Sequence, residues 1–134
     1  MAKKRRQSPG EAHEHSRIIR EGSAPTIEQE FPIVAEIRLR VTFEDVDEKK
    51  GPEPWSLRYA PAQKAFFEHR CPYWECVMGG FSFAPAVYSA VQSRKDSISG
   101  TERCQGWQDI ERMYKHGCRL KAHYEIEIAY RSAV

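Results

Sequence analysis

Four cysteines are the residues of this chain whose type and spacing point most directly to chemistry. Cys71 and Cys76 have four residues between them, and Cys104 and Cys118 have thirteen. Thiolate sulfur binds zinc, which takes four tetrahedral ligands in structural sites, often as two local pairs that the fold brings together. The sequence therefore predicts a zinc site made of Cys71, Cys76, Cys104 and Cys118.

The residues around each pair favour such a site. Pro72 presets a turn after the first cysteine, and Gly79 and Gly80 let the backbone fold back after the second. Two strands joined by a loop would bring the later cysteines side by side. We therefore expect both pairs to meet in the folded chain.

In this arrangement the chain resembles four-cysteine zinc domains of the zinc-ribbon or treble-clef kind. The resemblance is carried by Cys71-Pro72 through Cys76, by Gly79-Gly80, and by the later Cys104 and Cys118. It covers about half of the chain. Both cysteine intervals are longer than in a typical ribbon, so His69 or His116 could replace one cysteine as a ligand.

Two other states of the cysteines stay open, namely buried thiols without a metal and disulfides or a redox pair. The basic start of the chain is followed by no apolar h-region, and no stretch approaches the ~20 apolar residues that span a bilayer. We therefore expect a cytoplasmic protein that does not enter a membrane. Stable disulfides are rare there, which favours zinc. A small core gains from a metal cross-link, so the zinc is expected to be structural.

Signatures of common enzyme classes are missing from the sequence. It holds no Walker loop, no G-x-G-x-x-G, no G-x-S-x-G and no H-E-x-x-H. The zinc deaminase pattern fails because a proline follows Cys71 instead of preceding it. We therefore predict no catalytic residue. The alternative is a zinc- or thiol-dependent enzyme using Cys71 and Cys76, which needs an open zinc position or a thiol with a lowered pKa.

Aromatic and basic residues near the cysteines predict a contact surface. Tyr73 and Trp74 lie inside the first cysteine loop, and exposed rings can stack on bases. Residues 94–121 contain seven Lys or Arg against four acids, a local net charge of +3. We take Tyr73, Trp74, Arg112 and Lys115 as the partner-binding residues. The net charge of +2 for the whole chain is too small to choose between nucleic acid and another protein as the partner.

The scaffold is predicted from two stretches in which apolar and polar residues alternate, residues 33–43 and 118–130. A period of two is typical of a strand with one buried face. Shorter strands are suggested at residues 55–59, 64–70 and 101–107. Arg38 and Arg40 on the first long strand could lie opposite Glu125 and Glu127 on the second.

Residues 82–95 predict the main helix, with Ser82 as the N-cap and Pro85 in the first turn. Its expected buried face consists of Phe83, Val87, Ala90 and Val91. One helix packed on the apolar side of an antiparallel sheet makes the fold class α+β, with a four-cysteine zinc centre.

The domain is predicted to span residues 32–134, because residues 1–31 hold few large apolar side chains and indicate a flexible tail. The predicted function is a small non-enzymatic domain with structural zinc that binds nucleic acid or a protein. Besides the enzyme, the alternative is a structural subunit of a larger assembly, joined through a free strand edge at residues 33–43.

Overall fold

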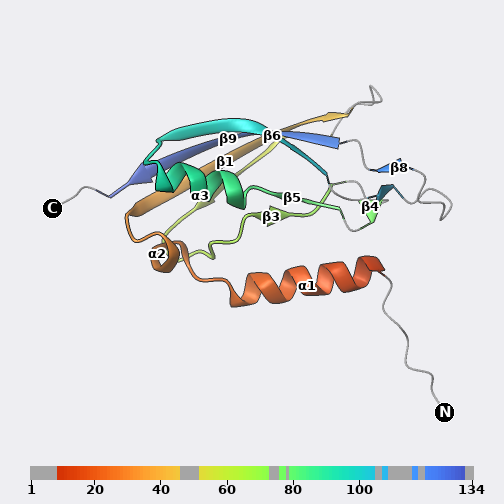
Figure 1. The fold of residues 1–134 in the computed structure, drawn as a ribbon, viewed down its shortest axis with the longest axis horizontal. Helices are drawn as coiled ribbons and strands as arrows, with labels where there is room; N and C mark the ends of the chain where they lie inside the picture. The colour runs from red at the N-terminus through yellow and green to blue at the C-terminus, as the bar shows by residue number, and fades with distance from the viewer. Residues whose placement is uncertain are drawn as a thin grey trace, which may run out of the picture.

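Two long strands lie side by side at the centre of a four-stranded antiparallel sheet (Figure 1). β1 (Val34–Asp45) pairs with β9 (Leu120–Tyr130) along its length. β2 (Trp55–Tyr59) flanks β1, and β6 (Ser97–Arg103) flanks β9. The computed structural model describes residues 9–45, 52–72, 76–77, 79–104, 107–108, 116–117 and 120–131.

The interior position of β1 corrects one expectation. Residues 33–43 were expected to offer a free edge to a partner sheet, but β1 is hydrogen-bonded to β9 on one side and to β2 on the other. Among the described strands of this sheet, the edges are β2 and β6. The predicted charge pairs are confirmed in register, since Arg38 lies opposite Glu127 and Arg40 opposite Glu125.

A β-bulge near the start of β1 changes which residues face the core. The register shifts between Val34 and Glu36, so Val34 is fully buried although strict alternation from Ile33 places it on the polar face. Beyond the bulge the predicted alternation holds. Each buried residue of β1 there is at most 1% exposed: Ile37, Leu39 and Val41.

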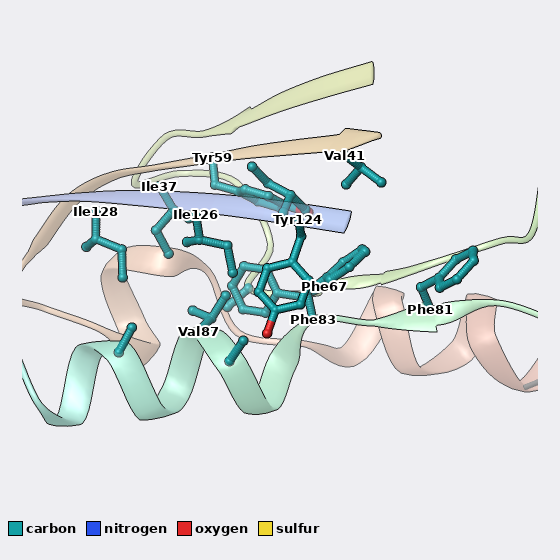
Figure 2. Close-up of a cluster of buried hydrophobic side chains, with 14 of the residues drawn as sticks. Ile37, Val41, Tyr59, Phe67, Phe81, Phe83, Val87, Tyr124, Ile126 and Ile128 are labelled. Atoms are coloured by element: carbon teal, nitrogen blue, oxygen red, sulfur yellow. The ribbon is translucent and has the colours of Figure 1, made fainter. Parts of the chain in front are cut away.

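Helix α3 (Ala84–Gln92) packs on the apolar side of the sheet and buries the predicted residues Val87, Ala90 and Val91 (Figure 2). In Figure 2 the side chains of Tyr124 and Ile126 point from β9 toward this helix. Burying each such large side chain stabilises the fold by roughly 1.5–3 kcal/mol. The α+β class, with an antiparallel sheet and one main helix, is therefore confirmed.

The ends of α3 differ from the prediction. Ser82 belongs to the short strand β5 (Phe81–Ser82), and Phe83 occupies the N-cap position without a side-chain hydrogen bond. Residues 97–100, which come just after the predicted helix, begin β6. Pairing with β9 explains the strand, since edge residues with small polar side chains complete the hydrogen bonds of an existing sheet at little cost.

The start of the chain is more ordered than the predicted tail. Residues 9–23 form helix α1 (Pro9–Ser23), and α2 (Ile27–Glu30) begins with a capping box between Thr26 and Gln29. Ile27 is fully buried and Phe31 is 6% exposed. The core therefore begins at Ile27, ahead of the predicted boundary at residue 32.

Two small sheets, one of two strands and one of three, accompany the main sheet. β3 (Glu68–His69) pairs with β5, in place of the longer strand predicted at residues 64–70. β4 (Cys76–Val77) pairs with β7 (Trp107–Gln108), which pairs with β8 (His116–Gly117). These short pairings connect the two halves of the chain that carry the cysteines.

Candidate metal centre

Three described cysteines reach one place from three different elements. Cys71 lies two residues beyond β3, Cys76 opens β4, and Cys104 follows β6 directly. The pairing of β4 with β7 brings the segment of Cys76 to the segment just after Cys104. Cys104 is anchored from the other side, because its backbone N–H donates to the carbonyl of Leu120 at the start of β9.

The thiol sulfurs are close enough to share an ion. The Sγ atoms of Cys71, Cys76 and Cys104 all lie within 4.8 Å of one another, and those of Cys76 and Cys104 are 3.5 Å apart. A tetrahedral zinc with zinc–sulfur distances of about 2.3 Å separates two sulfurs by about 3.8 Å. The observed range brackets that value, so this three-cysteine cluster can hold a metal ion.

Gly79 leaves the space in which the sulfurs meet. A Cβ at this position would overlap the Cys76 Sγ and would lie 2.9 Å from the Cys104 Sγ and 3.0 Å from the Cys71 Cβ. The missing side chain of Gly79 therefore lets the backbone pass against all three cysteines. Of the two glycines, Gly80 is the one with a positive φ, at +151°.

Gly80 contributes a hydrogen bond to the cluster. Its backbone N–H donates to the Cys104 Sγ at 3.3 Å. A donor aimed at sulfur stabilises the thiolate relative to the thiol, and this is the form that ligates metals. The same kind of contact around known metal sites orients the ligand and tunes its basicity.

The cluster is partly shielded from water. Cys104 is 6% exposed, and Cys71 and Cys76 are half-buried. The Sγ atoms of Cys76 and Cys104, 3.5 Å apart, are farther apart than the two sulfurs of a disulfide bond, which lie about 2.05 Å apart. A soft, sulfur-only donor set suits zinc, copper(I) or iron, and excludes the hard cations that require oxygen ligands.

His69, which the sequence offered as a substitute ligand, is directed elsewhere. Its Nε2 lies 3.0 Å from the Tyr59 hydroxyl, and its ring packs against Trp55 at 4.9 Å between ring centroids. Burial, together with the charge of Arg17, lowers the pKa of His69 to about 4. The imidazole is therefore neutral at neutral pH and serves the aromatic packing of β2 and β3.

The remaining predicted residues fall outside the described part of the chain. These are the fourth cysteine and the four predicted contact residues: Cys118, Tyr73, Trp74, Arg112 and Lys115. His116 lies in β8, where the backbone alone is described. The roles of these residues stay predictions.

Sequence reasoning missed two features of the site. The first is the need for a residue without a side chain at Gly79, which only the approach of Cys104 from a distant strand creates. The second is the contact of His69 with Tyr59. Tyr59 and His69 are ten residues apart and share no motif, so the sequence gives no indication of this contact.

No described helix is both long enough and apolar enough to cross a membrane. Comparison with protein-family models, with curated proteins and with solved structures finds no match to this chain. The three-cysteine cluster is therefore the feature of this chain that bears most directly on its function.

Proposed function

We propose that this chain is a small, non-enzymatic zinc-binding domain in which the metal is structural. The observation that supports it is the convergence of Cys71, Cys76 and Cys104 with all sulfurs within 4.8 Å. Cys71 and Cys76 lie close together in sequence, whereas Cys104 lies 28 positions after Cys76, so a shared ion would cross-link two distant parts of the domain. Zinc fits a sulfur-only donor set, and thiolate sites of this kind are usual for structural zinc.

Cys118 is the proposed fourth ligand. Gly117, its neighbour in sequence, pairs with Trp107, and Leu120 accepts the hydrogen bond from the Cys104 N–H. The described residues on both sides of Cys118 are therefore tied to the segment of Cys104. A fourth thiolate would close the coordination shell, which is the arrangement of a structural site. A catalytic zinc keeps one position for water or substrate.

A structural metal fits the location of the cluster. It lies among strands of only two residues, β3, β4, β5, β7 and β8, which have few hydrogen bonds of their own. Metal binding that requires the folded arrangement contributes its free energy to folding. Zinc would thus hold together the end of the molecule that the main sheet supports least.

The proposed role of the metal-bound end is to contact a macromolecule, either nucleic acid or a protein. The support is in the sequence, where Tyr73 and Trp74 lie between the first two cysteines and Arg112 and Lys115 lie between the later two. Nucleic-acid affinity would fall steeply with added salt, because phosphate contacts release counterions. Affinity for a protein held by the two aromatic rings would respond weakly to salt.

The first test is metal content per chain in freshly purified protein, by elemental analysis, with a thiol count before and after a chelator. We expect one zinc per chain and four thiols that become reactive only after chelation. Cobalt(II) substitution then reports the ligands, because thiolate-to-cobalt absorption grows with each coordinated sulfur. Metal-free protein with four reactive thiols, and no cobalt spectrum, would refute the zinc centre.

The contact role has a separate test. Tyr73→Ala combined with Trp74→Ala should leave zinc content and the melting temperature unchanged while it weakens binding to single-stranded nucleic acid or to the captured protein partner. Val134 is remote in sequence from both cysteine pairs, and Val134→Ala is the control. A double variant that unfolds would show that the two rings belong to the core, and the contact proposal would then be wrong.

A further inference from the structure

A second site lies away from the thiols, in an open cavity of about 740 Å³ between α1, β2 and β3. Small-molecule sites usually have volumes of about 300–1,000 Å³ and combine apolar walls with a few polar groups. The cavity lies along β2, an edge strand of the main sheet. Its lining includes none of the three clustered cysteines.

One wall of the cavity is aromatic and held in place. Trp55, Tyr59 and His69 line it, and the His69 ring packs between Trp55 at 4.9 Å and Phe83 at 5.8 Å. The contact of His69 Nε2 with the Tyr59 hydroxyl, at 3.0 Å, fixes the orientation of the imidazole. Leu57, 41% exposed, adds an apolar surface beside these rings. A flat apolar ligand would therefore meet a preformed wall.

The lining of the cavity carries more positive than negative charge. Four cations, Arg17, Arg58, Lys64 and Arg70, stand against two carboxylates, Glu21 and Glu68. Both carboxylates are engaged by arginines, because Glu21 pairs with Arg17 and Glu68 pairs with Arg20 of α1. Neither carboxylate is therefore left to repel an anion.

The cations are only partly compensated by neighbouring acids. Arg58 shares Glu36 with Arg38, and Arg70 shares Glu14 with Arg17. Each of these two carboxylates thus faces two guanidinium groups.

Lys64 is the cation least neutralised by the protein. Its Nζ donates to the carbonyls of Gly22 at 3.3 Å and Ala24 at 2.8 Å, and no described carboxylate pairs with it. An ammonium group has three donors, so one remains for an anion in the cavity.

We propose that this cavity binds a small planar anion, an aromatic ring that carries a phosphate or a carboxylate. The ring would lie against the wall of Trp55, Leu57 and His69, and the anionic group would bind Lys64 and Arg58. The aromatic wall and the surplus of cations together carry this inference, and it does not depend on the zinc proposal.

The test is a titration of the full chain, with its metal, followed by amide chemical shifts. Adenosine 5′-monophosphate and indole-3-carboxylate serve as the two ring anions. Adenosine, indole and inorganic phosphate serve as probes that lack either the charge or the ring. We expect at least one ring anion to bind with a Kd below about 1 mM and to shift the amide signals of residues 57–59, 64 and 69. Its affinity should be at least about tenfold higher than that of the matching uncharged ring, adenosine or indole, and of inorganic phosphate. Which of the two ring anions binds identifies the phosphate or the carboxylate as the anionic group.

Two exposed variants test the charge without disturbing the core. Arg58→Gln and Lys64→Met should each weaken binding by about tenfold, whereas Lys95→Met, an exposed lysine beyond the end of α3, should leave it unchanged. Failure of both ring anions to bind at about 10 mM, or equal affinity in both cavity variants and the wild type, would overturn the proposal. Metal content measured on the same samples keeps the two proposals apart, since a metal-free chain that binds a ring anion contradicts only the zinc centre.

Discussion

The Cys76 sulfur lies 3.5 Å from the Cys104 sulfur, although 27 residues separate the two in the chain. The intervening chain forms β5, α3 and β6, so the contact depends on the whole path from the small sheets through the helix and back along the edge of the main sheet. The pairing of β4 with β7 closes this path. Metal binding at the cluster would therefore require the correct tertiary fold as well as the correct local loops.

Replacing Gly79 with alanine should abolish metal binding. The added Cβ would overlap the Cys76 Sγ and lie 2.9 Å from the Cys104 Sγ, so the thiols would have to separate. We expect loss of metal from the purified variant and a lower melting temperature. Gly22→Ala is the matched control, because nothing lies within 4 Å of its Cβ, and alanine in a helix is favoured by up to about 1 kcal/mol. Equal metal content in the two variants would contradict the role given to Gly79.

The identity of the fourth ligand can be tested with Cys118→Ser and His116→Ala. If Cys118 completes the site, the serine variant should lose most of its zinc affinity and part of the cobalt–thiolate absorption, while His116→Ala retains both. The reversed result would assign the fourth position to His116. Cys104→Ser provides the reference for a lost ligand, because its sulfur belongs to the described cluster.

Ile27 should prove part of the core, although the sequence places it in a tail. Ile27 is fully buried, and Ile27→Ala should lower the free energy of unfolding by about 2–5 kcal/mol. Ile18, in α1, is 55% exposed, so Ile18→Ala should change this free energy by no more than about 0.5 kcal/mol. Urea denaturation of both variants measures the difference. A loss of stability for Ile27→Ala as small as that for Ile18→Ala would show that the burial of Ile27 contributes little to folding.

Because Tyr59 is buried, we expect the protein to lose stability in alkaline solution. Burial first, and then the charge of Glu21, raise the pKa of the Tyr59 hydroxyl above its ordinary value of about 10. Above pH 10 an unfolded chain releases this proton while the folded chain keeps it, so the free energy of unfolding falls as the pH rises. Tyr59→Phe removes this contribution and is the variant to compare.

The measurement is urea denaturation of wild type and Tyr59→Phe between pH 9 and pH 11. The wild type should lose more stability than the variant over this range, by up to about 1.4 kcal/mol for each pH unit above 10. The other tyrosines are common to both proteins and cancel in the difference. Parallel curves would mean that Tyr59 titrates in the folded protein as it does in the unfolded chain.

Local patterns predicted those parts of the fold in which one residue type repeats along one element. The strands at residues 34–45 and 120–130 follow from alternation, and the buried face of α3 follows from helical spacing. The predictions were wrong where a distant partner decides the conformation. The strand predicted at residues 101–107 begins earlier, at Ser97, where the chain pairs with β9, and Val34 turned inward because of a bulge.

The sequence by itself determined the chemistry at issue: four thiols in two spaced pairs, a glycine pair between them, and two half-buried strands to carry a sheet. Only the tertiary structure decided that three of the sulfurs meet, that Gly79 makes room for them, and that His69 faces Tyr59 instead of the metal site. The physical reason is the distance along the chain over which each kind of interaction acts. Alternation and turn propensity act over a few neighbouring residues, whereas the cluster and the charged cavity are formed by residues brought together through strand pairing and core packing.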